Sequence, residues 1–105
     1  MSKFVALLSG KSKNLFSEAL LGEHVAHLQR LDDSGKLHLC GPFKDDDSAI
    51  QILIADTLEE ANLLIQQDPF VQHGYYKTVA VKELIEANSG NNWLTNHPQT
   101  EEKRR

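Results

Sequence analysis

The chain has 105 residues, of which 40% are hydrophobic and 25% charged, a composition typical of a single soluble globular domain. No apolar run approaches the roughly 20 residues that a membrane-spanning helix needs, and the N-terminus does not resemble a signal peptide. The net charge is −4 without a basic stripe, which argues against nucleic-acid binding, and the single cysteine cannot form an internal disulfide. We therefore expect a cytoplasmic protein with neither membrane nor nucleic-acid partners.

The first half of the chain predicts a strand, a helix and a second strand. Residues 4–9 form a short apolar run that ends at Gly10, as expected for a strand. Apolar residues recur at helical spacing over residues 15–34, and Gly35 supplies the left-handed conformation that ends a helix. Residues 36–40 alternate between apolar and polar side chains, which predicts a second strand.

The second half predicts a strand, a helix and a last strand. Residues 49–55 read as a strand, and a capping box at residues 57–60 predicts the start of a second helix. Pro69 should end that helix and hold Asp68 in an extended conformation. Residues 75–82 then form the last predicted strand.

This order, β-α-β-β-α-β, predicts an α+β ferredoxin-like fold with both helices on one face of a four-stranded antiparallel sheet. Strand 49–55 is apolar on both faces, with three isoleucines on one face and Leu53 on the other. We expect a second copy of the chain to cover the face that carries Leu53, giving a homodimer. The alternative is an exposed face of small residues with Gln51 at its centre.

The domain boundary is expected after residue 87. Residues 1–87 contain all predicted elements, and residues 88–105 read as a C-terminal extension rich in polar residues. Trp93 is the main apolar anchor of this extension, which we expect either to be mobile or to dock on the partner through that side chain.

His27 and Asp68 are the residues that suggest chemistry. Helix 15–34 places His24 and His27 on the face directed toward the core, and a histidine exchanges protons near neutral pH. Topology brings both helices to one face of the sheet, so His27 and Asp68 can meet as an acid–base pair. The alternative is a buried histidine bonded to backbone and a carboxylate that caps a helix end. Two histidines are too few for a zinc site, and no nucleotide-binding motif occurs, so we expect neither metal nor cofactor.

A series of short motifs, in the right order over about residues 3–82, resembles the YciI-like (YCII) family. The motifs are His27-Leu28 with Leu31, Gly35-Lys36-Leu37, Gly41-Pro42-Phe43, Asp45, Leu58-Glu59-Glu60-Ala61, Asp68-Pro69-Phe70, Gly74 and Val79-Ala80-Val81. The resemblance implies a dimeric α+β barrel of ferredoxin-like protomers. Related members include a dehydrochlorinase of chloroaromatic breakdown, and the barrel is similar to that of muconolactone isomerase.

The family also implies an active-site pair of a helical His and the Asp of the Asp-Pro-Phe motif, which correspond here to His27 and Asp68. Members often carry Arg three residues before the His, where this chain has His24. We assign ligand binding to His24 and to the loop residues Gly41, Pro42 and Phe43.

The predicted function is cofactor-free acid–base catalysis on a small cyclic or aromatic acid, by elimination, isomerisation or hydrolysis. The alternative is a module that binds a small molecule or another protein without catalysis. An RNA-recognition domain has the same strand order, but strand 49–55 offers neither stacking aromatics nor basic residues.

Overall fold

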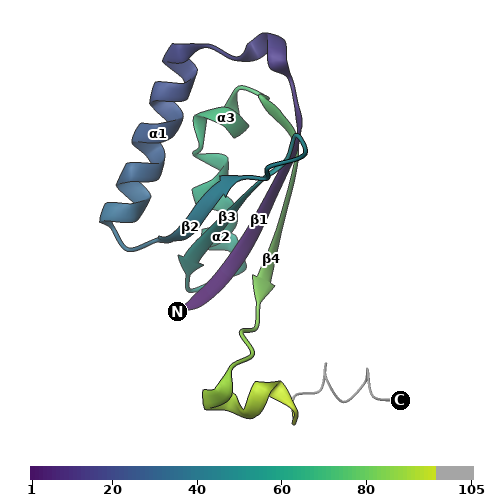
Figure 1. Cartoon of the computed structure of the whole chain (residues 1–105). Coiled ribbons are helices and arrows are strands. Elements are labelled where there is room, and N and C mark those ends of the chain that lie inside the picture. The colour runs from purple at the N-terminus through teal and green to yellow at the C-terminus, as the bar shows by residue number, and fades with distance from the viewer. Residues whose placement is uncertain (97–105) are drawn as a thin grey trace.

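The computed structural model describes residues 1–96, and residues 97–105 of the predicted extension lie outside the described part. The elements are β1 (Ser2–Lys11), α1 (Glu18–Asp33), β2 (Leu37–Pro42), β3 (Ala49–Ala55), α2 (Leu58–Gln66), α3 (Pro69–Gln72) and β4 (Tyr76–Leu84), with short 3-10 turns at Lys13–Leu15 and Ser89–Leu94. The strands form one antiparallel sheet in the order β2-β3-β1-β4 (Figure 1). The predicted α+β ferredoxin-like topology is confirmed. No helix of the described residues has the length and apolarity needed to cross a membrane.

Helix α1 begins three residues later than predicted, because residues 13–15 form a 3-10 turn, but it ends near the predicted glycine. The Ser17 hydroxyl accepts a hydrogen bond of 3.0 Å from the Leu20 backbone N–H and so caps the first turn. Gly35, at φ +73°, takes the left-handed conformation just beyond the other end. The buried residues Leu20, His27 and Leu31 lie one to two turns apart and pack α1 onto the sheet.

Helix α2 starts where the capping box predicted, because Thr57 Oγ1 accepts the Glu60 backbone N–H at 3.1 Å. The chain then makes an additional short helix that was not predicted. Pro69 occupies the first turn of α3, where its missing N–H costs no hydrogen bond, and Asp68 caps it in the predicted extended conformation (φ −68°, ψ 123°). Pro69 therefore both ends α2 and begins α3.

The predicted assignment of the two sheet faces is wrong. Leu53 is fully buried beneath the helices, and the three isoleucines of β3 lie on the face without helices. The register pairs Val5 with Ile52, which places Val5 on that same bare face, and Leu7 beside it is 47% exposed. Both faces of β3 are apolar, so the alternation of side chains along the strand does not indicate which face the helices cover.

The bare face is apolar over the centre of the sheet, and no helix lies over it (Figure 1). We call it the open face; its apolar residues are Val5, Leu7, Leu39, Ile50, Ile52, Ile54, Ala80 and Leu84. A contiguous apolar surface of this kind marks an interaction site in soluble proteins.

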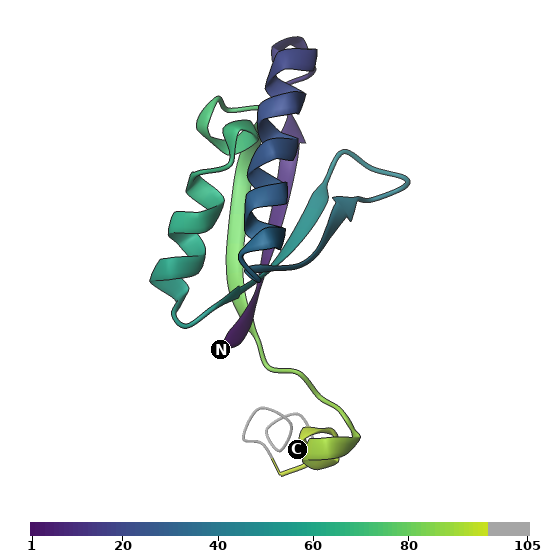
Figure 2. The ribbon, with the colours of Figure 1, turned by 90° about the vertical axis from the view of Figure 1, so that its left-hand side faces the viewer.

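The described part of the extension stands away from the sheet (Figures 1 and 2). Its turn Ser89–Leu94 is closed by a capping box in which Asn88 and Asn91 bond to each other's backbone. The Trp93 side chain is 61% exposed. Docking of Trp93 on a partner stays a prediction.

Candidate active site

The site is built around the carboxylate of Asp68, which is fully buried between the helices and the sheet. Pro69 restricts the backbone of Asp68 to an extended conformation. The Asp68 Oδ1 atom accepts a hydrogen bond of 2.9 Å from the Phe70 backbone N–H. Two further bonds come from other elements. His24 Nδ1 of α1 lies 2.7 Å from Oδ1, and Gln51 Nε2 of β3 donates to Oδ2 at 2.8 Å. Three segments distant in sequence therefore converge on one carboxylate.

Asp68 contacts His24 and not His27, the partner that the sequence predicts. His27 is 3% exposed and lies farther along α1, facing the Leu64 backbone of α2, and its Nε2 has no hydrogen-bond partner within residues 1–96. The two histidines share the inner face of α1, but α3 carries Asp68 against the turn that contains His24. The residue assigned to ligand binding is thus the one that contacts the carboxylate.

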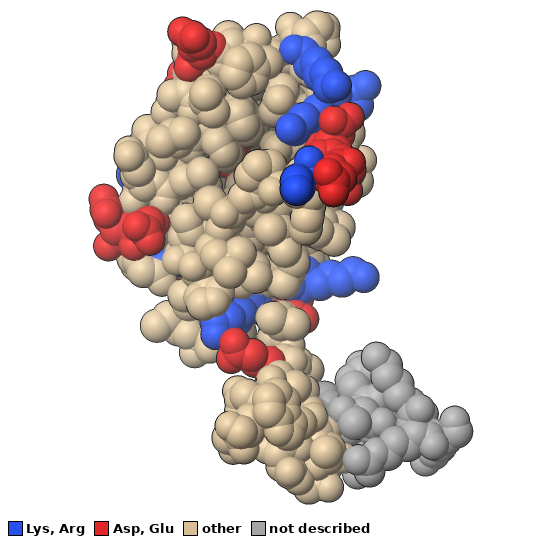
Figure 3. Space-filling model, viewed as in Figure 1, with Lys and Arg blue, Asp and Glu red and all other residues tan. Residues whose placement is uncertain are grey.

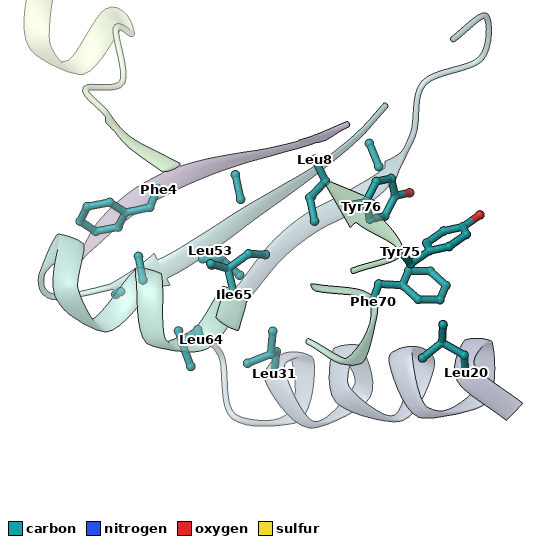
Figure 4. Packing of buried hydrophobic residues seen from close by; sticks show 14 residues of the cluster. Phe4, Leu8, Leu20, Leu31, Leu53, Leu64, Ile65, Phe70, Tyr75 and Tyr76 are labelled. Atoms are coloured by element: carbon teal, nitrogen blue, oxygen red, sulfur yellow. The ribbon is translucent and has the colours of Figure 1, made fainter. Parts of the chain in front are cut away.

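The His24 ring is held on a second side by aromatic stacking. It lies parallel to the Phe70 ring, with centroids 3.9 Å apart and planes at 11°. Phe70 also contacts Tyr75 at a centroid distance of 4.5 Å and Tyr76 at 5.9 Å. Figure 4 shows these three rings together at one end of the core, with Phe4 at the other end. The imidazole therefore has one preferred orientation.

The hydrogen bonds determine which forms the two groups take. Burial raises the pKa of Asp68, but the hydrogen bond and charge of His24, with the bonds from Gln51 and Phe70, more than offset it, so the pKa lies below 3.8. The carboxylate is therefore ionised at neutral pH and can only accept hydrogen bonds. It follows that His24 Nδ1 carries a proton and Nε2 is the nitrogen that can exchange one with a ligand. The His24 side chain is 14% exposed, and the carboxylate is not exposed at all.

His24 lines a cavity of about 330 Å³ between α1, α3 and the edge of the sheet near β2. This volume suits a small molecule. The lining is mostly apolar and aromatic; its residues are Leu8, Lys11, Phe16, Leu21, His24, Leu28, Cys40, Gly41, Pro42, Ala49, Ile50, Gln51, Phe70, Tyr75 and Tyr76. In Figure 3 the face over α1 and β2 has few charged side chains at its centre, and those present gather at its margins.

The cavity includes three of the four residues assigned to ligand binding. His24, Gly41 and Pro42 line it, whereas Phe43 does not and is 42% exposed. The Phe43 backbone N–H bonds to the Ser48 carbonyl at 2.9 Å and closes the β2–β3 hairpin. A role of the Phe43 side chain in ligand binding stays a prediction.

Several lining residues were not identified from the sequence. Tyr75 and Tyr76 stand at the start of the last predicted strand, and nothing in the local sequence pattern distinguishes them or Lys11 as lining residues. Burial raises the pKa of Tyr76 to about 12, with the charges of Tyr75 and Asp68 adding to the effect, so its phenol stays protonated. Gln51 did carry a signal, since it is the one polar residue in an otherwise apolar strand.

The environment of His27 predicts a stability change with pH. Burial lowers its pKa below 6.5, the charges of Arg30 and His24 add to this effect, and Asp68 and the Leu64 carbonyl oppose it. The unfolded chain then binds more protons than the folded one, so stability should fall as the pH drops below 6.5. The slope for one proton is at most about 1.4 kcal/mol per pH unit.

Urea denaturation of wild type and His27→Leu between pH 5 and pH 8 measures this contribution as the difference between their two slopes. His38→Leu, at an exposed position, is the control and should keep the wild-type slope. Identical slopes in wild type and His27→Leu would contradict the assignment.

Within residues 1–96, no group of three or more His, Cys, Asp or Glu side chains is arranged to hold a metal ion. The arrangement described above instead offers a histidine base, an ionised carboxylate that orients it, and a small aromatic cavity beside them.

The comparisons with known proteins agree with this fold. In structure the chain is similar to 5-chloro-2-hydroxyhydroquinone dehydrochlorinase from Burkholderia phenoliruptrix in complex with 2,5-dihydroxybenzoquinone, with a TM-score of 0.60 and 19% sequence identity. The match covers 86% of this chain and 99% of that chain, and at this identity it shows a shared fold. No curated protein matches the sequence significantly. The YCII-related domain family matches residues 3–85, most of the chain, and the protein therefore belongs to the YCII-related domain family.

Proposed function

We propose that this protein is a cofactor-free acid–base enzyme that acts on a small cyclic or aromatic acid, with His24 as the base and Asp68 as the residue that orients it. The supporting observation is the 2.7 Å contact between His24 Nδ1 and the fully buried Asp68 carboxylate, on the wall of a cavity of about 330 Å³. A histidine whose Nδ1 is held by a carboxylate presents Nε2 in one orientation, as proton transfer requires. His27, the base predicted from the sequence, has no place in this proposal.

The reaction class follows from what a single base can do. His24 Nε2 removes a proton from a ring carbon, and the electron pair of that C–H bond forms a new double bond. In an elimination, a leaving group on the neighbouring carbon departs with its bonding electrons; in an isomerisation, the imidazolium returns the proton to a different carbon. Hydrolysis by the same base, acting on water, is the third possibility. Asp68 stabilises the imidazolium throughout because it stays ionised.

The cavity supports a small planar substrate. Phe16, Phe70, Tyr75 and Tyr76 contribute flat apolar surface to its lining, which suits an unsaturated ring. Lys11 supplies the positive charge that an acidic substrate group would need. The ligand bound to the dehydrochlorinase of similar fold, a dihydroxybenzoquinone, is also small and planar.

Proton abstraction can be tested before the full reaction is known. We expect wild type, in deuterated water, to catalyse exchange of ring C–H hydrogens or release of chloride from a panel of hydroquinones, chlorohydroquinones and unsaturated lactones. The His24→Gln variant should lose at least about a hundredfold of this rate, because a positioned general base contributes 10²–10⁴-fold. NMR and ion-selective measurements follow exchange and chloride.

His27→Gln is the matched control, since it makes the same change one turn away, and its rate should stay within a few fold of wild type. Retention of the wild-type rate by His24→Gln would exclude His24 as the base. If the panel binds to wild type without exchange or bond cleavage, the binding-module alternative becomes the better interpretation.

The proposal includes a homodimer. The open face exposes a contiguous apolar surface. If two copies packed their open faces against each other, each would cover the apolar surface of the other. A cytoplasmic location is also part of the proposal, and it rests on the overall composition and the single cysteine.

A further inference from the structure

Gln51 is an unusual residue for its position. It lies in the middle of β3, on the face covered by the helices, and is 3% exposed. Its neighbours across the sheet are small, with Ala6 on β1 and Cys40 on β2 directly opposite. Gln51, Cys40 and Ala49 all line the cavity, so the glutamine belongs to its floor at a point where small side chains leave room for a ligand.

The orientation of the Gln51 amide is determined by Asp68. The ionised carboxylate can only accept hydrogen bonds, so the amide nitrogen must be the atom that faces Oδ2, at 2.8 Å. Oε1 is then directed away from Asp68. This oxygen is buried and has no hydrogen-bond partner within residues 1–96. A buried acceptor without a partner is unfavourable, and a ligand donor that reached it would restore the missing bond.

We propose that Gln51 is a specificity-determining residue whose Oε1 accepts a hydrogen bond from a hydroxyl group on the substrate ring, so that the enzyme acts on hydroxylated planar rings. This inference rests on the proposed function, because it takes the cavity beside His24 as the substrate site. It adds a requirement that the proposed function does not contain, namely a donor on the ligand.

The position of Gln51 also restricts where the hydroxyl lies on the substrate. His24 and Gln51 bond to the two oxygens of one carboxylate, at 2.7 Å and 2.8 Å. The two side chains therefore meet at one carboxylate, and both line the cavity. A ligand that engages both must carry its hydroxyl close to the C–H bond that His24 attacks, on the same or the neighbouring edge of the ring.

Gln51 has a second role, since its amide also supports Asp68, and the test must separate the two. Loss of the bond to Asp68 changes the site for every ligand equally. Loss of Oε1 as an acceptor changes only ligands with a donor. The ratio of two dissociation constants, measured for matched ligands with and without a hydroxyl, therefore reports the acceptor alone.

The probes are 3-hydroxybenzoate and 3-fluorobenzoate, which share a ring and a carboxylate for Lys11 and differ in the donor. Titration calorimetry or ligand-observed NMR on the full chain should show that wild type binds the hydroxy compound about tenfold or more tightly. In Gln51→Met, which keeps the length of the side chain without polar atoms, the two constants should become equal within about twofold. Gln66→Met makes the same replacement at an exposed position of α2, outside this cavity, and should keep the wild-type ratio.

Equal affinities in wild type, a preference that persists in Gln51→Met, or binding of neither probe at millimolar concentration would each overturn the proposal. Because these experiments measure binding, they do not depend on catalysis. If His24→Gln loses exchange activity while Gln51→Met still discriminates, the proposed function stands and the inference about Gln51 fails. If wild type discriminates but catalyses no exchange, Gln51 still selects ligands by their hydroxyl group, and the proposed catalysis fails together with the statement about substrates.

Discussion

Leu7→Asp should reduce the sedimentation mass of the protein from two chains to one without unfolding it. Leu7 is 47% exposed at the centre of the open face, so a single chain in water tolerates a carboxylate there. In the proposed dimer the same carboxylate would be buried against apolar side chains without a partner, a cost of several kcal/mol. Sedimentation velocity at micromolar concentration measures the mass, and circular dichroism confirms that the chain stays folded.

Two further variants make this result specific. Leu58→Asp introduces the same charge at a side chain of the same exposed fraction, 47%, but on α2, and should leave the mass unchanged. Leu53→Asp should unfold the protein, because Leu53 is fully buried and the variant both opens a cavity and buries a charge, at a cost above about 4 kcal/mol. A wild-type mass of one 11.8 kDa chain would exclude the dimer.

Asp68→Asn should destabilise the protein by about 2–4 kcal/mol and remove the proposed acid–base activity. The change keeps the shape of the side chain, but the amide has one acceptor oxygen where the carboxylate has two. Three donors face this side chain, from His24, Gln51 and the Phe70 backbone. At least one buried donor then loses its partner, and the charge that strengthened the other bonds is lost. Chemical denaturation at neutral pH measures the loss of stability.

The same change has a predictable pH dependence. The pKa of Asp68 is lower in the folded state than its ordinary value of 3.8, so its contribution is present above that value and is lost as the pH falls through the folded pKa. Wild type and Asp68→Asn should therefore approach each other in stability in strong acid. Asp45→Asn, the same replacement in an exposed loop, should match wild type throughout. Equal stability of Asp68→Asn and wild type at neutral pH would show that the three hydrogen bonds contribute nothing.

The fold was predictable because its signals are local. The strand order follows from alternation and helical spacing, and two caps fixed element boundaries: Gly35 ended α1, and Thr57 began α2. The extended conformation of Asp68 follows from the proline after it. Each of these features depends on a few adjacent residues, which is the information a single sequence contains.

The sequence predicts Asp68 as a site residue but not its partner, because the partner depends on how the helices pack against one another. His24 and His27 share one helical face, and helical spacing alone cannot say which of them meets Asp68. The position of α3 decides which histidine contacts Asp68, and this four-residue helix is too short to be recognised from helical periodicity. The prediction for the two faces of β3 was wrong for a related reason. Both faces are apolar, and the inner face is the one that carries Gln51, which bonds to Asp68 below the helices.

The convergence of α1, β3 and α3 on one carboxylate also concerns the order of events when the molecule opens. His24 and Asp68 are 44 residues apart in sequence, and Gln51 and Asp68 are 17 apart, so the constellation exists only while all three segments are docked together. Transient detachment of α1 alone separates the base from its carboxylate, although the sheet keeps its ladders. Such partial opening costs less than complete unfolding. Loss of the proposed activity on warming should therefore precede the main melting transition.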